Sequence, residues 1–401
     1  ILTAFSASEL GTAMPKSGGA YYYVNRALGP LFGSVAGWAN WMGLAFASAF
    51  YMVGFGEYVV NISGGAIGIP LTDVAIPVGV KAVALVGAAL FVLINYVGAK
   101  ETGKLQNVIV VVLVAILTVF TIVGSLRADP TNLAEPTGLE PMLATTGLIF
   151  VSYLGFVQIT SVAEEIKEPG KNLPRAVIGS VVIVTTIYAL VLIVMSAAVE
   201  QGFIAGLPEG QIAVVEVARL VLGPAGAVAM LIGGLLATAS SANASILASS
   251  RINFAMGRDQ IVSQELNQIH PRFGTPYRSI AITGGLILLF IVLADVNTLS
   301  TLGSVLHLII YALLNVALIV MREADVEGYD PSYEVPLYPI VPAVGAVVSI
   351  ALIAFIEPRV VAIGGGFVAF ALLWYFGYAR PPTTSEGALS VYVRSPPDEM
   401  P

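Results

Sequence analysis

The stretch FVSYLGFVQITSVAEEIKEPGKNLPRA, residues 150–176, decides what kind of fold this chain adopts. It begins as an apolar membrane-type segment. At YLGFVQ, residues 153–158, small and polar residues interrupt the apolar run. It ends in two adjacent carboxylates and a loop rich in Pro, Lys and Arg. Inside a bilayer, a weakened helix exposes backbone polar groups, which are tolerated only where they meet protein, water or a cavity. An interrupted helix among many membrane helices is typical of a transporter's binding site.

The composition of the whole chain places this stretch in a membrane protein. Of the 401 residues, 57% are hydrophobic and 11% are charged, whereas a typical soluble domain has about 25% charged residues. The formal net charge of -7 gives no indication of a nucleic-acid partner. The absence of cysteine excludes disulfides, thiolate metal sites and cysteine nucleophiles. We therefore expect an all-α integral membrane protein in contact with the lipid bilayer.

The apolar runs predict how the chain crosses the membrane, at about 20 residues a span. Residues 1–10 form a weaker apolar piece that is too short to span, so we expect the chain to start within a helix that an N-terminal portion precedes. Residues 1–380 are predicted to form one polytopic transmembrane domain, with a short surface helix over 214–222. Residues 381–401 are predicted to be a disordered cytoplasmic tail. The ten predicted full spans are 31–55, 81–98, 106–124, 142–163, 173–199, 225–248, 280–294, 299–321, 340–356 and 360–378.

The Lys and Arg residues predict the orientation of these spans. With Lys16 on the cytoplasmic side and the loops assigned alternately, fourteen of the 18 basic residues fall on that side. The four outer ones are Lys81, Arg127, Arg219 and Arg359. This asymmetry follows the positive-inside rule and indicates a multi-pass protein of the cytoplasmic membrane.

The sequence shows no common enzyme signature such as HExxH, GxSxG or GxxxxGKS. One of its two histidines, His270, lies in a predicted cytoplasmic loop, and the other, His307, lies in a span. A lone membrane histidine is more often packed and hydrogen-bonded than catalytic. We predict no catalytic residue, no metal site and no cofactor. Charged residues inside the spans are also nearly absent, which disfavours an ion pore or a proton wire.

Three carboxylates stand at predicted cytoplasmic helix ends. Glu9 ends the first, partial helix, and we predict that it caps or anchors that helix end. Glu164 and Glu165 end the interrupted helix, and we predict that they form a structural latch rather than a substrate site. The predicted partners in this latch are basic residues of the next loop and helix, namely Lys167, Lys171 and Arg175.

Small and polar residues gather in two spans, where they either pack helices closely or line a polar path. The run ATASSANASILASS, residues 237–250, places Thr238 and Ser241 on one helical face and also contains Asn243. The run WANWMGLAFASAFYM, residues 38–52, has Ser48 midway. Both interpretations stay open. Further candidate polar residues for a binding site, in the span 299–321, are His307, Tyr311 and Asn315.

Three motifs resemble those of amino acid–polyamine–organocation permeases. ELGTAMPKSGGAYYYVNRALGPLFGSVAGW, residues 9–38, resembles the signature that follows the second helix of that family. SYLGFVQITSVAEEIKEPGKNLPRA resembles its sixth helix and the next loop, and ANASILASSRINFAMGRDQ with HPRFGTP resembles its eighth helix and loop. The resemblance implies an inverted-repeat transporter fold of five plus five helices and two further C-terminal helices. On this mapping the first helix and part of the second are missing from the chain.

The resemblance also implies a binding site, in which the sixth-helix break offers carbonyl groups to a substrate amine. Gly155 is then expected because the backbone must leave the helix without a Cβ clash. Val157 stands where relatives often have an acidic or polar residue, which argues against a cationic substrate. The implied substrate-binding residues are Phe150, Tyr153, Leu154, Gly155, Phe156, Ser48, Ser241 and Asn243.

The resemblance leaves the coupling ion open. Leu113 lies about where some proton-coupled relatives have a lysine, so that proton mechanism is not expected here. Thr238 and Ser241 form a candidate cation site for Na⁺. Exchange of one substrate for another needs no ion. Symport with Na⁺ or H⁺ and antiport therefore all stay open.

These observations predict a secondary active transporter or exchanger that moves a neutral amino acid, or a related amine, by alternating access. One alternative is a carrier of the same fold for another small solute, such as a cationic amino acid, a polyamine or an inorganic ion. The other alternative is a membrane scaffold that transports nothing.

Overall fold

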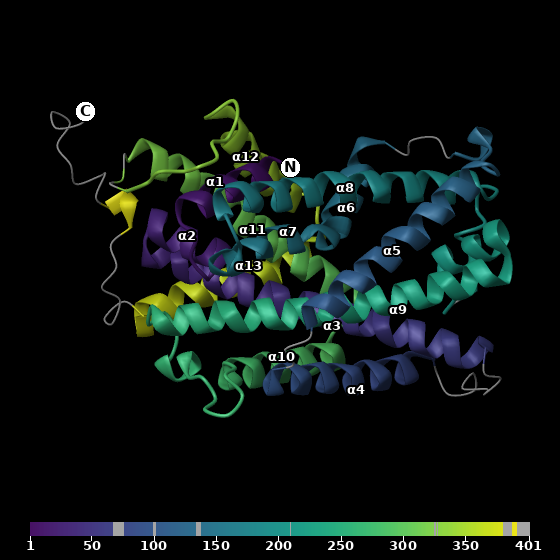
Figure 1. Cartoon of the computed structure of the whole chain (residues 1–401), viewed down its shortest axis with the longest axis horizontal. Helices are drawn as coiled ribbons and strands as arrows, with labels where there is room; N and C mark the ends of the chain where they lie inside the picture. Colours follow the sequence, from purple (N-terminus) through teal and green to yellow (C-terminus); the bar gives the residue numbers. More distant parts are fainter. Residues whose placement is uncertain are drawn as a thin grey trace.

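The computed structural model describes residues 1–66, 76–98, 102–133, 138–208, 210–324, 326, 328–379 and 387–390. Long helices dominate these residues, and many of them run along the long axis of the molecule (Figure 1). The α-helices are α1 (Leu2–Ala13), α2 (Gly19–Leu28), α3 (Pro30–Ala66), α4 (Ile76–Val97), α5 (Thr102–Ser125), α6 (Leu139–Ile149), α7 (Gly155–Gln158), α8 (Pro169–Ala197), α9 (Ala213–Arg258), α10 (Tyr277–Leu293), α11 (Val296–Glu323), α12 (Ile340–Ile353) and α13 (Pro358–Trp374). Shorter turns of helix are η2 (Pro130–Asn132), η3 (Phe150–Tyr153), η4 (Ile159–Glu165), η5 (Gln264–Asn267) and η6 (Tyr375–Ala379).

The described helices include at least seven that could cross a membrane. Seven are long and apolar enough by themselves, and a bent pair, Leu139–Gly147 with Phe150–Glu165, raises the number to eight. Two shorter apolar helices, Tyr277–Leu293 and Ile340–Ile353, cover two more of the predicted spans. The chain is therefore a multi-pass membrane protein built from helices.

Helices α3 and α11 form the centre of the bundle. Buried residues make up 72% of the apolar window of α11, against 11% for that of α5. Small residues let the two backbones approach, since a Cβ on Gly303 of α11 would lie 3.6 Å from the carbonyl oxygen of Gly43 and 3.8 Å from the amide nitrogen of Ala47. Close approach through small residues is a common way of packing membrane helices. Peripheral helices such as α5 instead expose their apolar side chains, as a lipid-facing helix should.

Two predicted boundary features can be compared with the structure. The predicted surface helix over residues 214–222 is present as the first part of α9, and Gly223 separates it from the long span with φ 75° and ψ −169°. This left-handed torsion suits glycine, which has no Cβ to clash. The predicted tail, residues 381–401, lies outside the described residues except for 387–390, so its disorder stays a prediction.

Neighbouring glycines on α10 allow a matched test of this packing. A Cβ on Gly284 would lie 2.6 Å from a methyl carbon of Val92 in α4, whereas a Cβ on Gly285 would meet nothing within 4 Å. Val92 is stiff because it is β-branched. We expect Gly284→Ala to destabilise the protein by about 1–3 kcal/mol through overpacking.

Gly285→Ala is the control, and it should be neutral or should stabilise the helix by about 0.5–1 kcal/mol. The measurement is the melting temperature of each purified variant in detergent. Equal melting temperatures for the two variants would contradict the close packing of α4 against α10.

Candidate functional site

The interrupted helix predicted from the sequence is present and is longer than expected. After α6 the chain winds into the tight 3₁₀ turn η3, one turn of α-helix in α7, and a second 3₁₀ segment, η4. The two halves of this span meet at 51°. Inside η4, Val162 leaves helical torsions altogether, with φ −112° and ψ 18°. The change from α to 3₁₀ winding alters the pairing of backbone groups, so carbonyl oxygens along the break become available to other partners.

Tyrosine hydroxyls from the two central helices bind these carbonyl oxygens. The Tyr51 hydroxyl of α3 donates to the Val151 carbonyl at 3.2 Å, and the Tyr311 hydroxyl of α11 donates to the Tyr153 carbonyl at 3.4 Å. Both distances exceed the roughly 2.5–3.0 Å that is usual for hydrogen bonds between a hydroxyl and an oxygen, so these contacts are weak. The break is therefore held between α3 and α11 by contacts that a stronger donor could replace.

Aromatic rings surround the same carbonyl groups. The ring of Tyr311 lies 5.6 Å from that of Phe150 and 5.3 Å from that of Phe156, measured between centroids. Tyr153 faces Tyr188 of α8 at 5.9 Å. None of these side chains carries a charge at neutral pH. Sequence reasoning placed Phe150, Tyr153 and Phe156 here but missed Tyr188, because no local motif links α8 to the break.

The other predicted residues of the break have different surroundings. Leu154 is buried and packs with Ala47 of α3. Gly155 is exposed, has helical rather than left-handed torsions, and a Cβ there would meet nothing within 4 Å. The expectation that glycine is needed to turn the backbone is therefore wrong, since the 3₁₀ segments make the bend. Ser48, next to Ala47, is fully buried and its hydroxyl has no partner among the described residues.

The residues predicted on α9 do not gather at the break. The Asn243 side-chain oxygen accepts a hydrogen bond of 2.6 Å from Asn95, which binds it to α4. The Thr238 hydroxyl donates to the Gly234 carbonyl at 2.9 Å, and its methyl group faces Gly54 of α3. Ser241 is half-buried on the same helix. The candidate cation site thus lies between α3 and α9 and does not include the carbonyl groups of η3.

A further polar contact of the break also escaped the sequence analysis. The Gln158 side chain of α7 donates to the side-chain oxygen of Asn40 in α3 at 3.1 Å. Asn40 lies three turns before Tyr51 on α3, so one face of this helix meets the break along its length. Asn315, predicted as a polar candidate, is instead occupied: it accepts from Ser6 at 2.7 Å and donates to Thr3 at 2.9 Å, both on α1.

The two carboxylates at the end of η4 do form ion pairs, but with other partners than predicted. Glu164 accepts from Ser17 at 2.8 Å and lies 4.0 Å from Lys16. Glu165 pairs with Arg251 of α9 at 2.9 Å. These contacts join separate helices, at the end of the bundle that we call the basic end because it carries Lys16, Arg251, Arg258 and Arg322.

The predicted partners of the latch, Lys171 and Arg175, are directed elsewhere. Glu168 adopts left-handed torsions, with φ 46°, and caps the start of α8. Lys171 pairs with Glu168 itself, with 3.5 Å between Nζ and Oε2. Arg175 is exposed on α8. Closeness in sequence therefore pointed to the wrong pairs.

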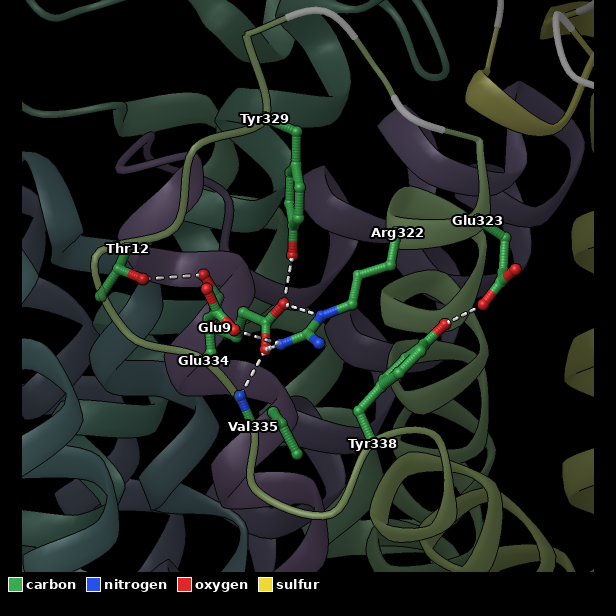
Figure 2. A network of polar contacts seen from close by, with 8 residues as sticks. All are labelled: Glu9, Thr12, Arg322, Glu323, Tyr329, Glu334, Val335 and Tyr338. Atoms are coloured by element: carbon green, nitrogen blue, oxygen red, sulfur yellow. Dashed lines mark hydrogen bonds and ion pairs between the residues drawn. The ribbon is translucent and has the colours of Figure 1, made fainter. Parts of the chain in front are cut away.

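A second network at the basic end surrounds the fully buried carboxylate of Glu9 (Figure 2). Arg322 of α11 donates to it from Nε and Nη2, each at 2.6 Å. The Tyr329 hydroxyl donates at 3.0 Å and the Val335 amide at 2.6 Å. The guanidinium also lies 4.5 Å above the ring of Tyr338. The predicted anchoring role of Glu9 agrees with this geometry, in which α1, α11 and the loop before α12 meet at one side chain.

The loop residues of this network keep their protons. Burial, together with the neighbouring Glu9 carboxylate, raises the pKa of Tyr329 above its ordinary value. Burial and the hydrogen bond to Glu323 raise the pKa of Tyr338 in the same way. Both hydroxyls therefore stay donors at neutral pH, and the Glu9 carboxylate stays fully bonded.

Comparison with known proteins identifies relatives of this chain. The sequence profile of a family described as amino acid permease matches residues 1–385. The methylthioribose transporter of Bacillus subtilis (strain 168) is 28% identical over 86% of this chain and 76% of its own length. The branched-chain amino acid permease BcaP of the same organism is 27% identical over 95% and 83%. Its serine/threonine exchanger SteT is 26% identical over 84% and 75%.

The Glu9 network leads to a prediction about stability. Glu9→Gln removes the negative charge and leaves Arg322, which is mostly buried, without its counter-charge. We expect a loss on the order of 3 kcal/mol, as for other buried pairs that lose one partner. The measurement is the melting temperature of the purified protein in detergent.

Glu334→Gln is the matched control for this test. Glu334 lies 3.9 Å from the same guanidinium but is exposed, so its replacement should cost less than about 1 kcal/mol. If Glu9→Gln melted at the same temperature as Glu334→Gln, the Glu9 network would not be an anchor.

Proposed function

Because the chain belongs to the amino acid permease family, we propose that it is a secondary transporter that moves an amino acid or a related amine by alternating access across the cytoplasmic membrane. The observation that carries the proposal is the break between α6 and η4. Its Val151 and Tyr153 carbonyl oxygens are held by long tyrosine contacts next to the two most central helices. A substrate amine would bind where those hydroxyls now donate.

The chemistry of the break suits an ammonium group. An ammonium carries three N–H donors and no acceptor, so it matches a cluster of carbonyl oxygens. Its charge makes it a stronger donor than a tyrosine hydroxyl. The faces of Phe150, Phe156 and Tyr311 would add a favourable cation–π attraction. These groups recognise the part that all amino acids share, so the surrounding side chains would set selectivity.

The neutral lining favours a substrate with an uncharged side chain. Around the break the described aromatic and aliphatic side chains are uncharged, and so are the polar side chains of Gln158 and Asn40. A buried charge on the substrate would find no opposite charge there, at a considerable desolvation cost. Two of the relatives are named for neutral amino acids, branched-chain in one case and serine or threonine in the other. We therefore propose a neutral amino acid as the substrate.

The finer organisation of the fold forms part of the proposal. We assign α1, α3, α4 and α5 to the second to fifth helices of an inverted repeat of five plus five helices, the broken span, α8, α9, α10 and α11 to the sixth to tenth, and α12 and α13 to the two further helices. The central place of α3 and α11, on either side of the break, supports this assignment. A Na⁺ site at Thr238 and Ser241 would then lie beside α3 on α9.

Transport by the protein in liposomes tests the proposal. Vesicles loaded with a neutral amino acid should take up the same labelled compound in saturable counterflow, and arginine or glutamate in excess should compete weakly. Absence of saturable counterflow with all twenty amino acids would reject the proposal. Saturable transport of methylthioribose alone would favour a carrier for another small solute, as the name of one relative suggests.

The open space at Gly155 allows a sharper test. Gly155→Val fits the fold without a clash, because a Cβ there meets nothing within 4 Å. A substrate that reaches the break through this open space would be blocked by the added side chain, so we expect counterflow to fall at least about tenfold, equivalent to about 1.4 kcal/mol of lost binding. The protein should still enter the membrane and elute as one species.

Gly365→Val is the control, since position 365 on α13 is equally open and exposed. It carries the same cost of a β-branched residue in a helix but is far in the chain from the break. Unchanged substrate affinity in Gly155→Val, or an equal loss in both variants, would count against the break as the binding site.

A further inference from the structure

His307 is a buried polar side chain that the proposed substrate site does not use. It lies in α11 and is fully buried. Its Nδ1 is 2.9 Å from the carbonyl oxygen of Gly303, which can only accept, so Nδ1 carries the hydrogen and donates. The other ring nitrogen, Nε2, has no hydrogen-bond partner among the described residues. The imidazole is therefore held as one neutral tautomer with a bare acceptor nitrogen.

The ring is wedged between the two central helices. A Cβ on Gly43 of α3 would lie 2.6 Å from Nδ1 and 2.7 Å from Cε1 of His307. Only a glycine at this position leaves room for the imidazole. Any change in the distance between α3 and α11 would therefore change the space around this side chain.

His307 is also close to the proposed substrate site. Tyr311 follows it by one helical turn, and their ring centroids are 6.1 Å apart. Tyr311 in turn contacts Phe150 and Phe156 and donates to the Tyr153 carbonyl. One turn of α11 thus connects the bare nitrogen to the carbonyl groups of the break.

A proton on Nε2 would be costly in this conformation. The described contacts of the imidazole are the Gly303 carbonyl oxygen, the Tyr311 ring and the backbone at Gly43, and none of these carries a charge. A buried charge without a partner is strongly disfavoured. The titratable and charged groups on the elements packed against α11, and on α11 itself, are Glu9, Tyr21, Tyr22, Tyr23, Arg26, Tyr51, Glu57, Tyr58, Glu140, Tyr153, Tyr311, Arg322, Glu323 and Arg359.

Among the described residues, none of these groups forms a hydrogen bond or an ion pair with the imidazole. The carboxylate of Glu9 is bound to Arg322 at the basic end, and Arg322 lies about four helical turns after His307 along α11. The nearby Tyr51 and Tyr311 are neutral donors engaged with carbonyl groups. Protonation of Nε2 therefore requires a conformation that brings water or a carboxylate to this nitrogen.

We propose that His307 is the proton-coupling residue of this protein, and that its Nε2 binds one proton together with the substrate when the site is open to water on one side, and releases it to water on the other side once the substrate has left, before α3 and α11 close on the neutral ring. The proposal rests on the proposed transport of an amino acid. The carboxylate of the substrate, bound one turn away, would offset the charge of the imidazolium, so proton and substrate would travel in the same direction. The proton enters from water on one side and leaves to water on the other.

The first experiment separates coupling from transport in liposomes. Counterflow, which needs no driving force, is compared with accumulation driven by a pH gradient that is acid outside, with the membrane potential clamped. We expect the gradient to raise substrate accumulation by the wild-type protein several-fold. We also expect substrate uptake to acidify the vesicle interior. His307→Asn keeps an N–H near the position of Nδ1 for the Gly303 carbonyl but cannot take up a proton. It should keep measurable counterflow, at a lower substrate affinity, and lose the response to the gradient.

His270→Asn is the matched control, because His270 is the only other histidine in the chain. It should respond to the gradient as the wild type does. A wild-type protein that shows counterflow but no response to the gradient would overturn the proposal and leave the proposed function standing. A gradient response that survives in His307→Asn would overturn it too, whereas absence of counterflow in the wild type would instead reject the proposed function.

A second measurement needs no substitution at position 307. In His270→Asn the imidazole of His307 is the only one left, so ¹⁵N NMR of histidine-labelled protein reports its protonation directly. We expect a neutral ring without substrate at pH 7 and a protonated ring with saturating substrate. A ring that stays neutral in both conditions would overturn the proposal, even if His307→Asn does not fold.

Discussion

Each backbone group that a broken helix exposes in a membrane needs a hydrogen-bond partner, and in this protein the two central helices supply the partners. The Val151 carbonyl group accepts a hydrogen bond from the hydroxyl of Tyr51 in α3, and the Tyr153 carbonyl group accepts one from the hydroxyl of Tyr311 in α11. Because these tyrosines must reach the break, α3 and α11 have to flank it. Their mutual approach, through glycine and alanine, then fixes the centre of the bundle.

The basic end is organised around the segment that joins α1 to α2. Glu9 binds Arg322 of α11, Ser17 donates to Glu164 of η4, and Tyr21 donates to Asp259 beyond α9 at 2.9 Å. The motif of residues 9–38 thus takes part in holding three other elements together. Its acidic and polar residues therefore hold one end of the bundle together.

The sequence predicts the helices of this fold well and their polar contacts poorly. Long apolar runs and the weakened stretch at residues 153–158 are local patterns, so the spans and the interrupted helix could be expected. The partners of the break could not, because Tyr51 and Tyr311 lie 100 and 158 residues away from the carbonyl groups they bind. The predicted partners of the latch were wrong for the same reason, because Glu165 pairs with Arg251, which is distant in the sequence. Gly155 was expected to turn the backbone because it has no Cβ, whereas the 3₁₀ segments on either side of α7 make the bend.

The contacts between α1 and α11 limit how this protein can change shape. Asn315 binds Thr3 and Ser6 near one end of α1, and Arg322 binds Glu9 two turns further along the same two helices. Sliding or twisting one helix against the other would break these polar contacts together. The two helices must therefore move as one rigid pair, and any hinge between this pair and its neighbours has to lie outside it. The short connection after Ala13, where Gly18 and Gly19 both adopt left-handed torsions, is well suited to be such a hinge.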